Sequence, residues 1–244
     1  MASQPGNAKG VRMSLKRRLE IDVAKTFYDQ WELVATAGVP GPTELKLNAN
    51  YAKELKSATV LYADLNGSTR MVDHEDWRFS AEVYKTYLRC TSEIIKSESG
   101  RITAYDGDRV MAIYTGDHKN TQAVTSALKI NYAIKNILQP ALDRQYPTSG
   151  FKVKHVVGID TAFLRAARIG VHGDNDIVWV GRAANYAAKL TSLSEGTTWI
   201  TKAVYDVMLD KVKYSNGQDI WEARKWTSMD DFSIYRTNYW MPFD

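Results

Sequence analysis

Several features are scarce in this sequence of 244 residues, and each absence narrows what the protein can be. It has one cysteine, Cys90, so no disulfide can form within the chain, which fits a reducing compartment. No stretch approaches the roughly 18 consecutive apolar residues that span a bilayer, and the N-terminus has no apolar segment typical of a signal peptide. We therefore expect a soluble protein of the cytoplasm that contacts no membrane.

The chain also lacks a large excess of charge of either sign. The chain has 32 Lys and Arg against 28 Asp and Glu, a formal net charge of +4. A charge this small admits a polyanionic substrate but does not indicate a surface for nucleic acid, so we expect no nucleic-acid partner. Apolar residues make up 44% of the chain and charged residues 25%, which is ordinary for a globular protein.

The chain divides by pattern into three parts. Residues 1–13 are rich in glycine and polar residues, which predicts disorder. Residues 14–56 predict a helical extension and a linker, because Ser14 fits a helix cap and apolar residues recur at spacings of four up to Leu33. Residues 57–244 predict the main domain.

Strands and helices alternate in the main domain. Short apolar runs predict strands, and apolar residues three or four apart predict helices. The expected strands are 58–63, 101–105, 109–114, 153–159, 166–171, 177–180, 199–201, 220–226 and 232–236, and the expected helices are 76–97, 120–138 (ended by Pro140), 181–193 and 202–209. Their order, strand-helix-strand-strand-helix-strand, predicts an α+β fold with helices on one face of a mostly antiparallel sheet.

Two aspartates that are far apart in the sequence fall at neighbouring places in this arrangement. Asp64 follows the first strand, and Asp108 lies in the turn of the hairpin that comes after the first helix. Two carboxylates brought together repel unless a cation lies between them, and Mg²⁺ or Mn²⁺ prefers such oxygens. The backbone carbonyl of Leu65 is a natural third oxygen. The alternative for each aspartate is an ordinary turn or capping residue.

Three motifs around these residues resemble, in the same order, those of class III nucleotidyl cyclases. Tyr62–Thr69 resembles the first metal motif, and Gly100–Ala112 resembles the second metal hairpin with its Gly-Asp and Met-Ala signature. Gly181–Leu190 resembles the helix with the family's transition-state asparagine and arginine. The resemblance covers residues 57–236. It implies a ferredoxin-like βαββαβ core, here with an N-terminal helical extension.

The resemblance also implies an activity and a set of site residues. The enzyme would close a nucleoside triphosphate into a 3′,5′-cyclic monophosphate, with two divalent ions, Mn²⁺ or Mg²⁺, held by Asp64, the Leu65 carbonyl and Asp108. Asn185 would orient the ribose, and Lys225 falls where the family has a lysine for the terminal phosphates. In the family the sites lie across a head-to-tail dimer, which implies a homodimer whose metal ligands come from one chain and whose other catalytic residues come from its partner.

Lys189 stands where the family has its transition-state arginine. A lysine keeps the positive charge but loses the bidentate fork of the guanidinium group. Lys189 would still neutralise the phosphate as a point charge. Arg182, one turn earlier in the helix, and Arg70 are alternatives for this role.

The positions that recognise the base also depart from the family pattern. Ala104 stands where adenylate cyclases have a lysine and guanylate cyclases a glutamate, and Val178 stands where adenylate cyclases have an acidic residue or threonine. Neither side chain can hydrogen-bond a purine edge. A pyrimidine needs a narrower pocket, which the neighbouring Tyr105 and Trp179 would fill, although strand alternation places Ala104 and Tyr105 on opposite faces unless the hairpin is twisted. We count Tyr62 of the first motif with Ala104, Tyr105 and Val178 as substrate-binding residues.

The sequences of residues 62–69, 79–88 and 102–112 resemble those of the pyrimidine cyclases of the bacterial Pycsar anti-phage systems. That resemblance implies conversion of UTP to cyclic UMP upon infection, with the cyclic nucleotide activating a separate effector protein. UTP is the favoured substrate. The alternatives are a cytidylate cyclase acting on CTP, a purine cyclase, and an inactive cyclase-homology module that regulates a partner.

Overall fold

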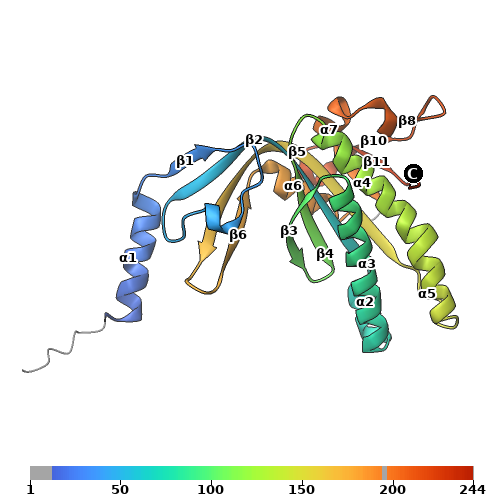
Figure 1. Ribbon diagram of the computed structural model, residues 1–244, viewed down its shortest axis with the longest axis horizontal. Coiled ribbons are helices and arrows are strands. Elements are labelled where there is room, and N and C mark those ends of the chain that lie inside the picture. The colour runs from blue at the N-terminus through green and yellow to red at the C-terminus, as the bar shows by residue number, and fades with distance from the viewer. Residues whose placement is uncertain (1–12, 194–196, 244) are drawn as a thin grey trace, which may run out of the picture.

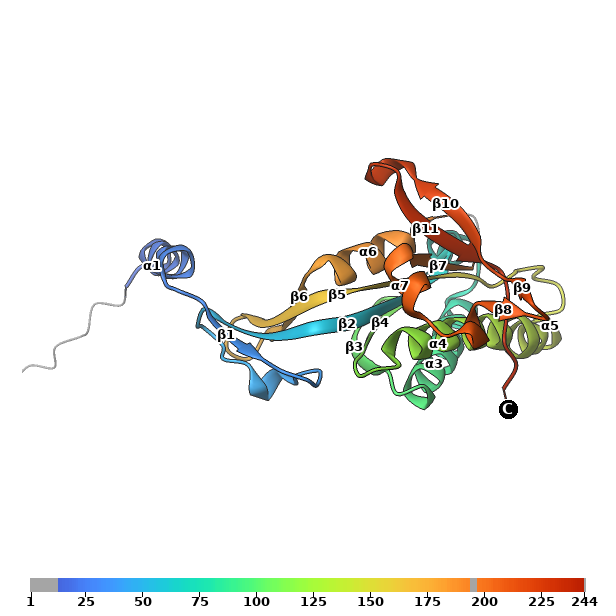
Figure 2. The ribbon, with the colours of Figure 1, turned by 90° about the horizontal axis from the view of Figure 1, so that it is seen from above.

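The computed structural model describes residues 13–193 and 197–243. In these residues a nine-stranded sheet has helices on both faces, and a small two-stranded sheet lies near the C-terminus (Figures 1 and 2). The disorder expected for residues 1–13 falls outside the described range except for Met13. No helix within that range has both the length and the apolar character needed to cross a membrane.

The elements follow the sequence pattern closely in the main domain. The helices are α1 (Leu15–Tyr28), α2 (Ser68–His74), α3 (Trp77–Ser97), α4 (Lys119–Ala133), α5 (Gln139–Gln145), α6 (Arg182–Leu190) and α7 (Lys202–Val207). The strands are β1 (Glu32–Ala35), β2 (Tyr51–Asn66), β3 (Arg101–Asp106), β4 (Arg109–Tyr114), β5 (Lys154–Gly170), β6 (Asn175–Val180), β7 (Thr198–Thr201), β8 (Tyr214–Ser215), β9 (Gln218–Asp219), β10 (Glu222–Trp226) and β11 (Phe232–Thr237). Helix α2 and the short pair β8 and β9 were not expected.

The centre of the sheet has the predicted ferredoxin-like topology. The strands run β10-β11-β7-β5-β2-β4-β3, so the unit β2-α3-β3-β4-α4-β5 forms a βαββαβ core. Strand β2 pairs antiparallel with both β4 and β5, which places the first strand beside the hairpin. The predicted α+β fold class is therefore confirmed.

Strands β2 and β5 are longer than expected and form an arm that leaves the core. Residues 51–56, expected as a linker, are the first part of β2, so a boundary at residue 57 falls within a strand. The two strands expected at 153–159 and 166–171 are the single strand β5. A register shift between Leu55 and Ala58 marks the place where the arm bends away, carrying β1 and β6 with it (Figure 1).

Three further expectations were wrong in detail. Leu33 lies in β1 rather than in the first helix, because β1 gains backbone hydrogen bonds by pairing in parallel with β2. Pro140 does not end a helix: a π-helical segment, Ile134–Leu138, precedes it and Pro140 lies in the first turn of α5, where its missing N–H costs little. Helices cover both faces of the sheet, since α6 lies opposite α3 and α4 (Figure 2).

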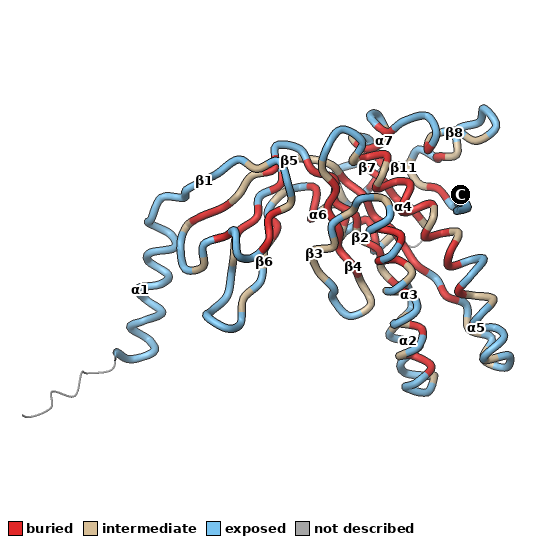
Figure 3. Tube along the Cα trace, in the orientation of Figure 1, coloured by how far each residue is buried: buried red, intermediate tan, exposed pale blue. Residues whose placement is uncertain are grey.

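Each face of the sheet has its own apolar core, because neighbouring side chains of a strand point to opposite sides. Leu61 of β2 packs with the α3 and α4 side chains, whereas Val60 packs with Ala183 and Ala187 of α6. Figure 3 shows the buried residues concentrated where the strands and the helices meet. Gly158 of β5 allows α6 to lie directly on the sheet. A Cβ at that position would come within 2.2 Å of the Ala187 carbonyl oxygen. The sheet therefore fixes the position of α6.

Candidate active site

The sheet register brings the two expected metal-binding aspartates together at one edge. Asp64 lies near the end of β2 and pairs with Arg109, the residue that follows Asp108 in the hairpin. Partial burial raises the pKa of the Asp64 carboxyl, Arg109 opposes this, and the negative charge of Asp108 raises the pKa further. The Arg109 Nε lies 3.4 Å from Asp64 Oδ2, so a neighbouring guanidinium balances part of the negative charge.

The oxygen atoms at this edge suit a hard divalent cation. Asp108 Oδ2 is buried and accepts no hydrogen bond from any described residue, which is costly for a carboxylate unless a cation or another donor binds it. A cavity of about 200 Å³ opens at Asp64, lined by Asp64, Leu65, Asn66, Gly67, Thr191, Ser192 and Leu193. No group of three or more His, Cys, Asp or Glu side chains gathers among the described residues. Backbone and substrate oxygens would therefore complete the coordination.

Helix α6 presents Asn185 and Lys189 on its solvent side. The two residues are four apart, so they lie one turn from each other on the same face, while Ala183, Ala184 and Ala187 are buried against the sheet. The Lys189 Nζ lies 3.6 Å from the Met229 sulfur in the turn between β10 and β11. Lys225, on β10, is exposed, and its Nζ lies 3.3 Å from Ser233 Oγ. Both lysines are thus held near uncharged partners.

Aromatic contacts join α6 to the hairpin of β10 and β11. The Tyr186 ring meets Trp226 at 5.6 Å and Phe232 at 5.3 Å between centroids, both edge-on. Since these rings come from the same elements as Lys189 and Lys225, the two lysines belong to one rigid surface.

The α6 surface and the aspartate edge are not joined within the chain. No hydrogen bond or ion pair in the described part of the chain links Asn185, Lys189 or Lys225 to either aspartate. Thr191, just after α6, is the nearest connection, with its Oγ1 3.5 Å from Asp64 Oδ2. The described residues thus form two separate groups of side chains, which we call the two half-sites.

The residues expected to contact the base separate into two groups. Ala104 pairs with Met111, which pairs with Tyr62, and these three residues pack against the same apolar cluster as Trp179. Val178, next to Trp179, is half-buried. Tyr105 lies elsewhere, because its hydroxyl is 2.9 Å from Ser92 Oγ of α3, on the opposite face of the sheet. The expectation that Tyr105 fills the base pocket is therefore corrected, and the twist of the hairpin does not override strand alternation.

Arg182, an alternative to Lys189, is occupied by a structural contact. Its Nε donates to Asp160 Oδ2 at 3.0 Å, and another of its nitrogens donates to the Thr161 carbonyl at 2.8 Å. Asp160 is fully buried, and burial raises the pKa of its carboxyl against the opposing effects of Thr201 and Arg182. Arg182 thus ties the start of α6 to β5. Arg70 lies on α2, exposed and close in sequence to the cavity.

Two residues at the site were missed by reasoning from the sequence. Arg109 follows Asp108 directly, so the hairpin register signals its approach to Asp64. Thr191 is 127 positions from Asp64, and no local pattern connects the two. Its contact with Asp64 depends on how α6 sits on the sheet.

The fold is that of the class III nucleotidyl cyclases. Among solved structures, the adenylyl cyclase CyaB from P. aeruginosa has a TM-score of 0.60 with 21% sequence identity, over 75% of this chain and 94% of that one. At that identity the likeness shows the fold.

Sequence comparison gives the family. The chain is 54% identical to a uridylate cyclase from Burkholderia cepacia over 228 residues, which cover 93% of this chain and 99% of that protein. It is 47% identical to a uridylate cyclase from Xanthomonas perforans, again over 93% of this chain. No protein-family model matches. The chain belongs to the uridylate cyclase family and is a nucleotidyl cyclase.

Proposed function

We propose that this enzyme converts UTP into 3′,5′-cyclic UMP and pyrophosphate at a two-metal site that is completed by a second copy of the chain. The buried, unpartnered oxygen of Asp108 beside Asp64 is the observation that carries the proposal. The naming of relatives as uridylate cyclases supports UTP as the substrate. The separation of the two half-sites within one chain supports the homodimer.

The residues take distinct roles in this reaction. Asp64, Asp108 and the Leu65 carbonyl would hold two Mn²⁺ or Mg²⁺ ions, which when bound lower the pKa of the ribose 3′-hydroxyl and neutralise phosphate charge. Asn185 of the partner orients the ribose so that the 3′-oxygen attacks the α-phosphorus in line as pyrophosphate leaves. Lys189 places a positive charge beside that phosphorus, and Lys225 binds the terminal phosphates.

The base pocket is formed on the α6 face of the sheet. Tyr62 and Ala104 line it and pack on the same apolar cluster as Trp179, whereas Val178 follows strand alternation to the other side of β6. The two altered positions have no lysine or acidic group with which to bind a purine edge, while Tyr62 offers a phenolic hydroxyl across Met111 from Ala104. This arrangement favours a single-ring base.

The product has a signalling role in this proposal. The motifs shared with the Pycsar cyclases support the synthesis of cyclic UMP in the cytoplasm upon phage infection. The cyclic nucleotide would then activate a separate effector protein.

The first prediction concerns substrate and metal ligands together. Purified protein incubated with equal ATP, GTP, CTP and UTP plus Mn²⁺ is expected to give cyclic UMP, identified by mass spectrometry. Asp64→Asn should lower the rate by at least about 100-fold, because an amide is a poor ligand for a hard cation. Asp106→Asn is the matched control, since Asp106 is an exposed acid of the same hairpin, and it should stay within about twofold.

Each other result has a defined meaning. Cyclic CMP would make the enzyme a cytidylate cyclase, and a cyclic purine nucleotide would overturn the assignment of Ala104 and Val178. An Asp64→Asn variant as active as the wild type would overturn the metal site. The absence of any product, in protein shown to be folded, would favour the inactive regulatory module.

A further inference from the structure

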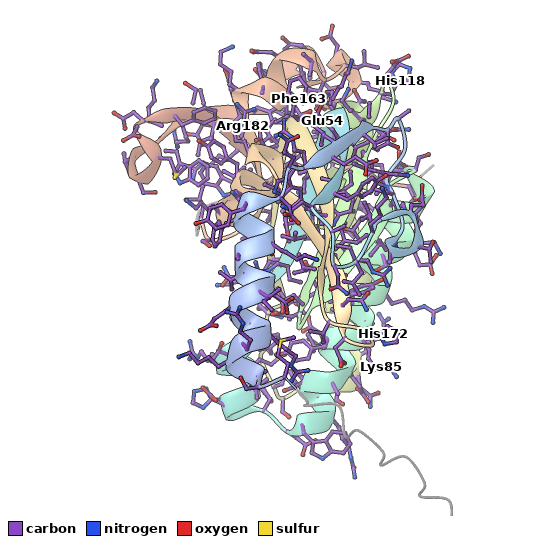
Figure 4. The ribbon with its side chains drawn as sticks, turned by 90° about the vertical axis from the view of Figure 1, so that its left-hand side faces the viewer. Glu54, Lys85, His118, Phe163, His172 and Arg182 are labelled. Atoms are coloured by element: carbon purple, nitrogen blue, oxygen red, sulfur yellow. The ribbon has the colours of Figure 1, made fainter. Side chains whose placement is uncertain are left out.

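Helix α1 is exposed along its whole length although one side of it is apolar. None of its 14 residues is buried. Leu15, Leu19, Val23 and Phe27 recur at spacings of four and form a stripe on one side, with exposed fractions between 54% and 81%. In Figure 4 the helix stands in front of the rest of the molecule. An apolar stripe of this kind indicates a surface that another molecule covers.

The position of α1 is fixed by contacts at its C-terminal end. The Asn50 side-chain amide donates to the carbonyls of Thr26 at 3.0 Å and Asp29 at 2.7 Å. Strand β1 follows at once and pairs with β2, and Glu32 forms an ion pair with Lys46. These contacts hold the helix on the arm and fix its direction, but they leave the stripe exposed.

An isolated helix of this length is only marginally stable in water, because nucleation is costly and packing supplies most helical stability in proteins. Ser14 caps α1, because its Oγ accepts a hydrogen bond from the Arg17 backbone N–H at 3.3 Å. That single cap does not replace a packed face. A partner surface packed on the stripe would supply the stability that the cap alone does not.

A complementary surface lies apart from α1 on the same molecule, where α2 meets α3 (Figure 1). We call residues 71–77, which join α2 to α3, the acidic corner. It presents the apolar side chains of Val72 (53% exposed) and Trp77 (71% exposed). Its charged residues are acidic, Asp73, Glu75 and Asp76. Helix α1, by contrast, has four Lys and Arg against two acidic residues.

Symmetry relates the two surfaces. Helix α1 and the α2–α3 pair both extend toward the bottom of the view in Figure 1, with the tips of the β5–β6 and β3–β4 hairpins between them. A two-fold axis between the two surfaces would carry α1 of each copy onto the acidic corner of the other. The contact is then made twice in each dimer, as an isologous interface requires.

We propose that α1 is a dimerisation arm, whose apolar stripe packs on Val72 and Trp77 of a second copy, with Lys16, Arg17 and Arg18 facing the acidic corner. This inference rests on the homodimer of the proposed function and names a contact within it. The exposed corner argues for a second copy over a lipid surface, because a lipid surface would leave Val72 and Trp77 uncovered.

A matched pair of variants tests the arm. Leu19→Glu places a charge in the stripe, and Ile21→Glu places the same charge on the opposite side of the same helix. Sedimentation equilibrium should show the dimer dissociation constant raised at least about tenfold by Leu19→Glu and changed less than threefold by Ile21→Glu. Circular dichroism should show both variants folded, because the stripe lies outside the core.

Disulfide trapping gives a readout that does not depend on activity. In a Cys90→Ser background, a chain with Leu19→Cys mixed with a chain with Val72→Cys should form a covalent dimer on mild oxidation. The same mixture made with Ile21→Cys in place of Leu19→Cys should form none. Because each chain has one cysteine, the bond can form only between copies.

The outcomes separate this inference from the proposed function. A dimer that forms cyclic UMP, is insensitive to Leu19→Glu and gives no trapped product would overturn the arm and leave the proposed function standing. A trapped dimer that makes no cyclic nucleotide would support the arm and overturn the proposed function. If Leu19→Glu instead abolished co-sedimentation with vesicles of anionic phospholipid and left the dimer intact, the stripe would belong to a membrane and the inference would be wrong.

Discussion

At the scale of single residues, a buried ionisable side chain outside the site makes the stability of the fold depend on pH. His155 of β5 is buried, and its Nε2 donates to Asn131 Oδ1 of α4 at 2.7 Å. The Asn131 amide in turn donates to Thr198 at 3.1 Å and to the Tyr239 carbonyl at 2.7 Å, which holds the C-terminal segment. Burial without a nearby carboxylate lowers the pKa of His155 from 6.5 to about 4. The imidazole is therefore neutral in the folded protein at neutral pH.

This pKa predicts a loss of stability in mild acid. The unfolded chain binds a proton on His155 below pH 6.5, whereas the folded chain resists until about pH 4, so acid favours unfolding. Between pH 7 and pH 5 this residue should lower the free energy of unfolding by about 2 kcal/mol. His155→Gln keeps a donor for Asn131 but cannot titrate. Urea unfolding at both pH values should show a smaller pH dependence for the variant, and an equal dependence would contradict the assignment.

At the scale of elements, the placement of α6 decides the geometry of half the site. Gly158 lets α6 approach β5, the ion pair of Arg182 with Asp160 ties its first turn down, and Tyr186 locks it to the β10–β11 hairpin. None of these residues is assigned to bind substrate. They set where Asn185 and Lys189 point.

The approach of α6 gives an element-scale prediction. In Gly158→Ala the new methyl group would meet the Ala187 carbonyl oxygen at 2.2 Å and Leu190 Cβ at 2.8 Å, so the helix must shift. We expect a loss of about 2 kcal/mol in the free energy of unfolding and at least about tenfold in cyclase turnover. Gly38→Ala is the control, because nothing lies within 4 Å of its Cβ position. Equal behaviour of the two variants in thermal melts and turnover assays would refute the close contact.

At the scale of the whole molecule, the two half-sites lie on separate surfaces of one chain. Asp64 and Asp108 occupy the edge formed by β2 and the β3–β4 hairpin, whereas Asn185 and Lys225 belong to α6 and β10. In the proposed head-to-tail dimer, each half-site would meet the other kind of half-site from the partner chain. Such a dimer has two sites, and each uses residues from both chains.

This division predicts complementation between inactive variants. Asp64→Ala and Asn185→Ala chains should each be inactive alone, yet coexpressed chains should recover about a quarter of wild-type turnover. Half of the dimers are then mixed, and each mixed dimer has one intact site. Measurement of cyclic UMP formation by the coexpressed protein tests this prediction. If mixed dimers recovered no activity, each site would be formed by a single chain.

The sequence by itself determined the features that depend on local order. The strand before Asp64, the hairpin around Asp108 and the helix containing Asn185 were all predicted, because apolar periodicity and turn chemistry act within a few residues. Residue motifs also indicated the cyclase class and the expected metal ligands. These signals need no knowledge of distant contacts.

Only the tertiary structure decided the rest. It placed Tyr105 against Ser92 of α3 and away from the base pocket, and it brought Thr191 to Asp64. It also drew Leu33 into a strand beside β2 and left α1 without a covered face. In each case the deciding energy comes from pairing or packing with residues far along the chain, which a local pattern does not contain.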